Sequence, residues 1–127
     1  MTASSGDSGK ASIHQLTAAV CSFARERDWE QFHDPKNLAM AIASEAGELA
    51  AVLRWSRNDE SDRLAQVEPT RERLRREIGD VGILLLLLCA RVGIPFETAI
   101  SVKLEENARN YPVGESIGRA ERPDVRV

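Results

Sequence analysis

The sequence predicts an all-α protein, a bundle of four helices. Apolar residues recur at three- and four-residue steps in four separate segments, which is the spacing of an amphipathic helix. No segment alternates apolar and polar residues with the period of two that marks a half-buried strand. A chain of 127 residues has room for one compact domain with a core of its own.

The first predicted helix covers about residues 12–27. The second begins at Asp34 and Pro35, an N-cap residue followed by proline at the first helical position, and runs to about residue 55. Residues 56–68 are polar and have no helical period, so we expect a linker there.

The last two predicted helices cover residues 69–92, which Gly93 ends, and residues 94–111, which Pro112 ends. The third helix is apolar nearly all round from Ile83 to Ala90, so we expect this segment to be buried on most sides. Four short helices seldom cover a helix so completely. We therefore expect a homo-oligomer, with a central place in a monomer as the alternative.

The two ends differ in composition from this region. Residues 1–11 are small, polar and rich in glycine and serine, which indicates a disordered leader. Residues 113–127 combine glycine, proline and scattered charges, which indicates a flexible tail. Residues 12–112 form the predicted domain.

Composition also excludes several classes of protein. Seventeen basic residues oppose twenty acidic ones, a net charge of −3 that argues against binding a nucleic-acid polymer. Cys21 and Cys89 are isolated, without the paired spacing of a zinc site, and predict buried, reduced thiols in the cytoplasm. The longest apolar run, Val81–Ala90, is about half as long as a membrane span requires.

Two matched acidic pairs stand out, Glu45-x-x-Glu48 in the second helix and Glu77-x-x-Asp80 in the third. Acids three residues apart share one helical face, and apolar residues flank both pairs. Four carboxylates from two helices offer oxygen ligands, which suit Mg²⁺ or Mn²⁺ rather than zinc. The alternative is that they are ordinary surface acids.

A glycine interrupts each acidic pair, at Gly47 and Gly79. A glycine inside a helix costs about 1 kcal/mol relative to alanine. Close approach of the two helices beside the acids would explain both glycines, so we expect such an approach.

Three motifs together carry a resemblance to a known family. They are the two acidic pairs, the run Asp28-Trp29-Glu30-Gln31-Phe32-His33, and the ending Lys103-x-x-x-Asn107-x-x-x-Tyr111-Pro112. This pattern, over about residues 23–112, resembles the MazG-like all-α nucleoside triphosphate pyrophosphohydrolases and, within that superfamily, the dCTP pyrophosphatase branch.

The resemblance implies a helical bundle assembled as a dimer of dimers. It implies hydrolysis of a deoxynucleoside triphosphate to the monophosphate and pyrophosphate, which clears that nucleotide from the pool. It also implies that the four acids hold Mg²⁺, and we assign to Glu48 the deprotonation of the attacking water. The residues implied or suggested to contact the nucleotide are Trp29, His33, Asn37, Trp55, Lys103, Asn107 and Tyr111.

Other readings of these residues stay open. Trp29 and Trp55 could instead pack in the core, His33 could pack in a loop, and Asn37 could cap a helix. Lys103 and its neighbours could form a solvated helix end.

Two positions depart from the base-binding residues of this branch. Val20 stands where the close relatives have a histidine, and Leu84 stands where they have a tyrosine. The alternatives to dCTP are therefore dUTP, a broad set of dNTPs or an oxidised nucleotide. A non-catalytic helical module for nucleotide sensing or oligomerisation is the alternative of another class.

Overall fold

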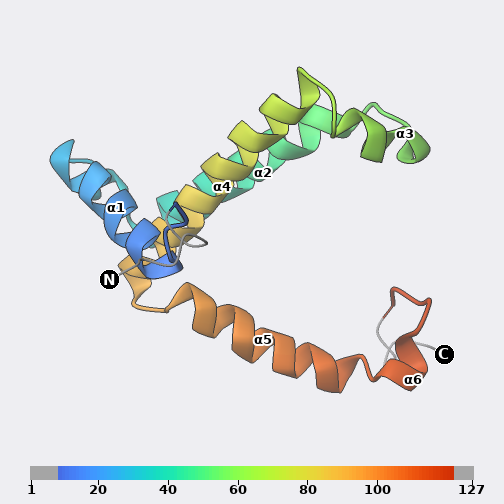
Figure 1. The fold of residues 1–127 in the computed structure, drawn as a ribbon. Coiled ribbons are helices and arrows are strands. Elements are labelled where there is room, and N and C mark those ends of the chain that lie inside the picture. The colour runs from blue at the N-terminus through green and yellow to red at the C-terminus, as the bar shows by residue number, and fades with distance from the viewer. Residues whose placement is uncertain (1–8, 122–127) are drawn as a thin grey trace, which may run out of the picture. The chain divides into compact units, whose positions relative to one another are not determined.

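The computed structural model describes residues 9–121, and every regular element in this range is helical. The all-α prediction is therefore confirmed. The elements in chain order are α1 (Ile13–Glu26), the 3₁₀ helix η1 (Glu30–Phe32), α2 (Pro35–Leu53), α3 (Asn58–Leu64), α4 (Thr70–Val92), α5 (Phe96–Asn110) and α6 (Val113–Ser116) (Figure 1).

Local hydrogen bonds explain where the long helices begin and end. The Ser12 hydroxyl accepts the backbone N–H of Gln15, and the Gln15 side chain accepts the backbone N–H of Ser12, which together form a capping box at α1. Asp34 caps α2 by accepting the backbone N–H of Asn37 at 3.0 Å. Gly93 ends α4 with a φ of 72°, in the left-handed region where glycine is favoured.

The prediction of four helices is incomplete in two places. The expected linker at 56–68 contains α3, which is short and has acidic residues in its first turn and Arg63 in its last. These charges interact favourably with the helix dipole. The segment has no apolar period, which is the pattern from which a helix is predicted. The tail expected at 113–127 contains α6, whereas residues 122–127 and residues 1–8 of the leader lie outside the described range.

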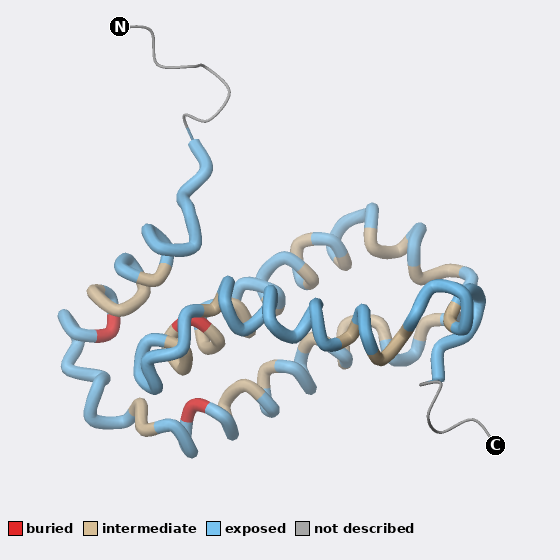
Figure 2. The backbone as a smooth tube through the Cα atoms, turned by 90° about the horizontal axis from the view of Figure 1, so that it is seen from below, coloured by how far each residue is buried: buried red, intermediate tan, exposed pale blue. Residues whose placement is uncertain are grey.

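The chain divides into two compact units, one up to Gly93 and one from Ile94 onwards. In the first unit, α2 and α4 lie side by side and antiparallel, and α1 packs on α4 (Figure 1). Its buried residues are Ala24, Leu38 and Leu86, one from each of these helices (Figure 2).

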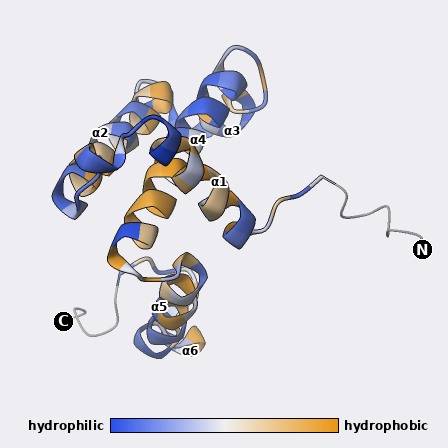
Figure 3. Ribbon diagram, turned by 90° about the vertical axis from the view of Figure 1, so that its left-hand side faces the viewer, coloured by the Kyte–Doolittle hydropathy of each residue, from blue (hydrophilic) through white to orange (hydrophobic). Residues whose placement is uncertain are grey.

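The apolar segment of α4 is only partly covered within one chain. Leu86 is buried, but Ile83 is 46 % exposed and Ala90 is exposed as well. The physical reason is that within the first unit α1 and α2 are the helices that pack extensively on α4, and they leave Ile83 and Ala90 exposed. Figure 3 colours the apolar residues of α4 orange. The predicted burial of Cys21 and Cys89 is also only partial, since both thiols are half-buried and unpaired.

The second unit contains α5 and α6. Within the described part of the chain α5 has no buried residue, and its apolar Ile100, Val102 and Leu104 are each more than half exposed. As for a membrane, no single described helix has the length and apolar character to cross one, although α4 and α5 pass that test when taken as a bent pair.

Candidate metal and nucleotide site

The acidic pairs of α2 and α4 meet in the first unit. Glu45 on α2 and Glu77 and Asp80 on α4 each place a carboxylate oxygen so that the three atoms lie within 4.8 Å of one another. Glu45 and Glu77 are half-buried and Asp80 is exposed. Because α2 and α4 run antiparallel side by side, residues more than thirty positions apart in the sequence share one face of the pair.

In the described range 9–121, no salt bridge involves an acid of the cluster. Burial raises the pKa of the Glu45 carboxyl, and the negative charges of Asp80, Glu77 and Glu48 raise it further. The Oε2 atom of Glu77 is buried and has no hydrogen-bond partner. An unpaired buried oxygen among clustered carboxylates fits a divalent cation, which takes oxygen ligands and removes the repulsion.

Glu48, the fourth acid, is exposed and does not belong to the group of three. It is nevertheless close enough to act on the pKa of Glu45 through its charge. The expected approach of α2 and α4 beside the acids is present, but it does not explain the two glycines within the single chain. A Cβ at Gly47 or Gly79 would meet no atom of a neighbouring helix within 4 Å, and both glycines are exposed.

The two tryptophans are accessible. Trp29 is 43 % exposed and makes an edge-to-face contact with Phe23, with ring centroids 5.7 Å apart. Trp55 is 87 % exposed and its ring lies 5.3 Å from the guanidinium carbon of Arg54. Core packing therefore does not account for Trp55, and accounts for only part of the Trp29 ring.

His33 and Asn37 flank the start of α2. His33 is half-buried, and its Nδ1 atom is buried without a hydrogen-bond partner. It lines a cavity of about 330 Å³ between α1, η1 and the end of α4. The Asn37 side-chain amide donates to the carbonyl of Phe32 at 3.2 Å, so it braces the loop after η1, whereas the cap itself is Asp34.

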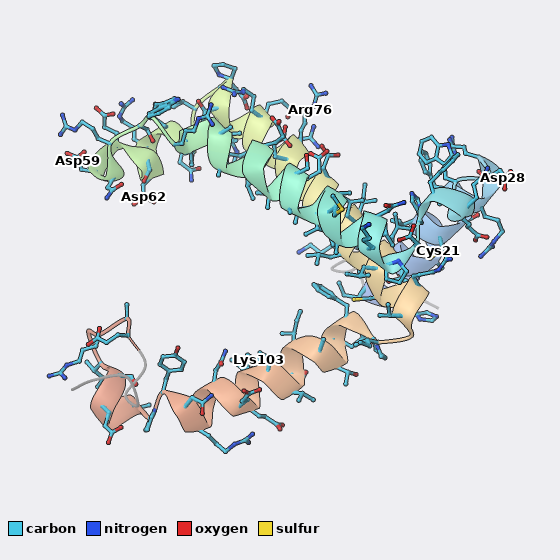
Figure 4. All side chains as sticks on the ribbon, turned by 180° about the vertical axis from the view of Figure 1, so that it is seen from behind. Cys21, Asp28, Asp59, Asp62, Arg76 and Lys103 are labelled. Atoms are coloured by element: carbon cyan, nitrogen blue, oxygen red, sulfur yellow. The ribbon has the colours of Figure 1, made fainter. Side chains whose placement is uncertain are left out.

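Lys103, Asn107 and Tyr111 belong to the second unit, at α5 and its end. Figure 4 labels Lys103 on α5. Lys103 and Asn107 line a shallow pocket of about 370 Å³ on α5. The Lys103 ammonium lies 3.1 Å from a carboxylate oxygen of Glu106, so this cation is paired on its own helix. Tyr111 is half-buried and its backbone N–H donates to the Asn107 carbonyl at 2.7 Å.

Val20 and Leu84, the two departures from the base-binding pattern, are both half-buried, on α1 and α4. The structure adds a group that the sequence reasoning missed. Arg91, in the last turn of α4, donates from Nη1 to the carbonyl of Glu30 at 3.1 Å. The available signal was a lone arginine at the end of an apolar helix, which does not identify a partner sixty-one residues away.

Known proteins share this sequence pattern. The model of the MazG-like family matches residues 40–122. The dCTP pyrophosphatase 1 of Bos taurus is 37 % identical over 113 residues, which cover 89 % of this chain and 67 % of the bovine protein. That of Mus musculus is 38 % identical over 108 residues, which cover 85 % of this chain and 64 % of the mouse protein. The chain thus spans about two thirds of the length of these curated relatives.

A solved structure shares the fold as well. The crystal structure of a pyrophosphatase from Archaeoglobus fulgidus matches with a TM-score of 0.75 and 34 % identity, over 81 % of this chain and 94 % of the archaeal one. The family model, the curated relatives and this structure agree with the resemblance that the acidic pairs indicate. The chain belongs to the MazG-like family.

Proposed function

We propose that this chain is a Mg²⁺-dependent nucleoside triphosphate pyrophosphohydrolase, which converts a dNTP to the dNMP and pyrophosphate. The observation that carries the proposal is the convergence of Glu45, Glu77 and Asp80 from two helices, with carboxylate oxygens within 4.8 Å of one another. The names of the relatives, dCTP pyrophosphatase 1 and a pyrophosphatase, support the same reaction class.

The chain's residues divide the chemistry between them. Glu45, Glu77 and Asp80 hold the ion, with Mn²⁺ as a substitute for Mg²⁺. When bound, a divalent cation neutralises phosphate charge and makes water more acidic. Glu48 lies outside the group of three, so its carboxylate is assigned to accept the proton of the water that attacks the α-phosphorus. Pyrophosphate then leaves.

The remaining predicted residues bind the nucleotide. Trp29 and Trp55 present exposed rings on which a base can stack, and His33 presents an unpartnered ring nitrogen. Asn37 braces the loop after η1 and is assigned to the base or the sugar. In the second unit, Lys103, Asn107 and Tyr111 offer a cation, an amide and a phenol for the phosphates.

The favoured substrate is dCTP or a modified dCTP, which the names of the relatives support. Val20 and Leu84 offer no hydrogen-bonding side chain, so the base is read by fewer polar groups than in the dCTP pyrophosphatase pattern. dUTP, a broad dNTP set and an oxidised nucleotide are the alternative substrates.

The active form is proposed to be a homo-oligomer, a dimer of dimers. The exposed apolar side chains of α4 and α5, Ile83 and Leu104 among them, support it because a second copy would cover them. The open space beside Gly47 and Gly79 is also compatible with another helix at that face. The two unpaired cysteines agree with a cytoplasmic location.

Pyrophosphate release across a panel of nucleotides, with Mg²⁺ or EDTA, tests the proposal. We expect EDTA-sensitive release with at least one dNTP, and dCTP or a modified dCTP to give the highest kcat/KM. Reaction in ¹⁸O-water should label the monophosphate. Label in pyrophosphate would exclude attack at the α-phosphorus, and nucleotide binding without turnover would favour the sensing module.

A further inference from the structure

Glu30, the first residue of η1, is held from two sides. Its carbonyl accepts a hydrogen bond from Nη1 of Arg91 at 3.1 Å, and its carboxylate lies 3.3 Å from Nε of Arg25 on α1. We call these three residues the Glu30 clamp. It connects α1, η1 and the end of α4.

The Arg91 contact is unusual in its range. Between residues 9 and 93, the other hydrogen bonds that an arginine side chain donates join residues at most six positions apart, whereas this one joins residues 61 positions apart. A hydrogen bond with a charged donor is roughly twice as strong as a neutral one. The clamp is therefore the main polar link between η1 and the helix that carries Glu77 and Asp80.

The segment that the clamp holds has little packing of its own. The 3₁₀ helix η1 has no buried residue, and Phe32 is 58 % exposed. Its other supports are local, from the Trp29 backbone N–H to the Ala24 carbonyl at 3.0 Å and from the Asn37 amide to the Phe32 carbonyl. A segment with so few apolar contacts takes its place from its hydrogen bonds.

The helix that anchors the clamp also carries the acids. Arg91 follows Asp80 by eleven residues on α4, about three helical turns and about 16 Å along the axis, so the two share one stripe of the helix. Trp29 and His33, which flank Glu30, are thereby positioned relative to the carboxylates. His33 also shares its cavity with all three residues of the clamp.

We propose that Arg91 is a positioning residue. Through the Glu30 carbonyl it holds the segment from Trp29 to His33 in one place on α4, and so sets the affinity for the nucleotide without touching the reacting atoms. The second part of this statement rests on the proposed function; the first does not.

Tryptophan fluorescence tests the positioning alone. The chain has two tryptophans, so Trp55→Phe leaves Trp29 as the reporter. In that background we expect Arg91→Gln to increase acrylamide quenching of Trp29, whereas Arg91→Lys, which keeps a charged donor, should restore most of the protection. Arg73→Gln is the matched control, an exposed arginine on the same helix. Equal quenching in Arg91→Gln and Arg73→Gln would overturn the proposal.

Kinetics test the consequence, in the chain that keeps Trp55. Loss of the charged hydrogen bond should raise KM about tenfold. The value of kcat should stay within about threefold, because the acids are untouched, and Arg91→Lys should recover most of the KM. A fall in kcat at unchanged KM would contradict a positioning role. If the unaltered chain hydrolyses no nucleotide, the proposed function fails, and the fluorescence still decides the clamp.

Glu30→Gln is a second variant, which tests the clamp if Arg91→Gln fails to fold. It removes the ion pair with Arg25 but keeps the carbonyl that Arg91 binds, so we expect a smaller rise in quenching than for Arg91→Gln. Circular dichroism establishes that each variant is helical. A larger effect for Glu30→Gln than for Arg91→Gln would assign the positioning to Arg25 and overturn the role of Arg91.

Discussion

The carboxylate cluster and the row of Lys103, Asn107 and Tyr111 are both predicted to serve the triphosphate, but they are built in opposite ways. Glu45 and Glu77 come from different helices, and between residues 9 and 121 neither forms a salt bridge. The row follows one helix, and its cation, Lys103, is paired with Glu106.

This difference separates a site that requires a ligand from one that does not. Within residues 9–121 no salt bridge pairs the acids of the cluster, and burial together with the neighbouring carboxylates raises the pKa of Glu45. The row is balanced along its own helix, so a phosphate must compete with Glu106 for the lysine. The cluster should therefore respond to metal, and the row to nucleotide.

A substitution in the carboxylate cluster is expected to lower activity the most. Glu77→Gln removes the residue with the unpartnered buried oxygen, and we expect kcat/KM to fall about 100-fold or more, since a bound ion contributes several kcal/mol to the transition state. Steady-state pyrophosphate release measures this, and far-UV circular dichroism should stay unchanged. Activity within threefold of the unaltered chain would remove Glu77 from the metal site.

A substitution in the row of Lys103, Asn107 and Tyr111 is expected to have a smaller effect. Lys103→Met should raise KM for the nucleotide about tenfold, because one charged hydrogen bond to phosphate is lost. Thermal stabilisation by metal alone should be unaffected. Arg109→Met is the matched control, an exposed cation on the same helix. Equal KM values for the two variants would show that Lys103 does not face the phosphates.

Metal binding to the cluster can be measured without turnover. Mg²⁺ at about 100 times its dissociation constant should stabilise the fold by about 2.7 kcal/mol, which differential scanning fluorimetry detects as a rise in Tm. Lys103→Met should keep this rise and Glu77→Gln should lose most of it. A rise that survives Glu77→Gln would place the ion elsewhere.

The smallest effect concerns pH. In EDTA, the raised pKa of Glu45 means that the folded chain binds more protons than the unfolded chain between the ordinary and the raised value. The contribution of Glu45 to the free energy of unfolding therefore falls as pH rises through that window. Urea titrations of the unaltered chain and of Glu45→Gln should differ in this slope, and Mg²⁺ should reduce the difference. Parallel slopes in EDTA would contradict it.

Sequence patterns predict the parts of the fold that depend on neighbours along the chain. Asp34 with Pro35 marks the start of α2, and Gly93 marks the end of α4, because caps and left-handed residues act within one turn. The sequence pattern does not predict the helix α3, because it lacks an apolar period. Its seven residues carry acids in the first turn and Arg63 in the last turn, which favour a helix through its dipole but produce no apolar period.

In the candidate site, too, the sequence predicts the features that depend on near neighbours and does not predict those that depend on helix packing. The spacing of Glu77 and Asp80 places them on one face of a helix, and the sequence is sufficient for that. It does not reveal that Glu45 joins them while Glu48 stays outside the group, nor that Gly47 and Gly79 face open space. Those facts depend on the rotation of α2 against α4.

By itself, then, the sequence determined the helical class, the helix limits set by caps and the acidic faces, because each follows from contacts within a few residues. Tertiary structure decided which acids converge, and it alone connects Arg91 to Glu30 across the first unit. It also decided how far the apolar part of α4 is covered within one chain. The physical reason is that helix periodicity is local, whereas the distance between two helical faces depends on how the helices pack.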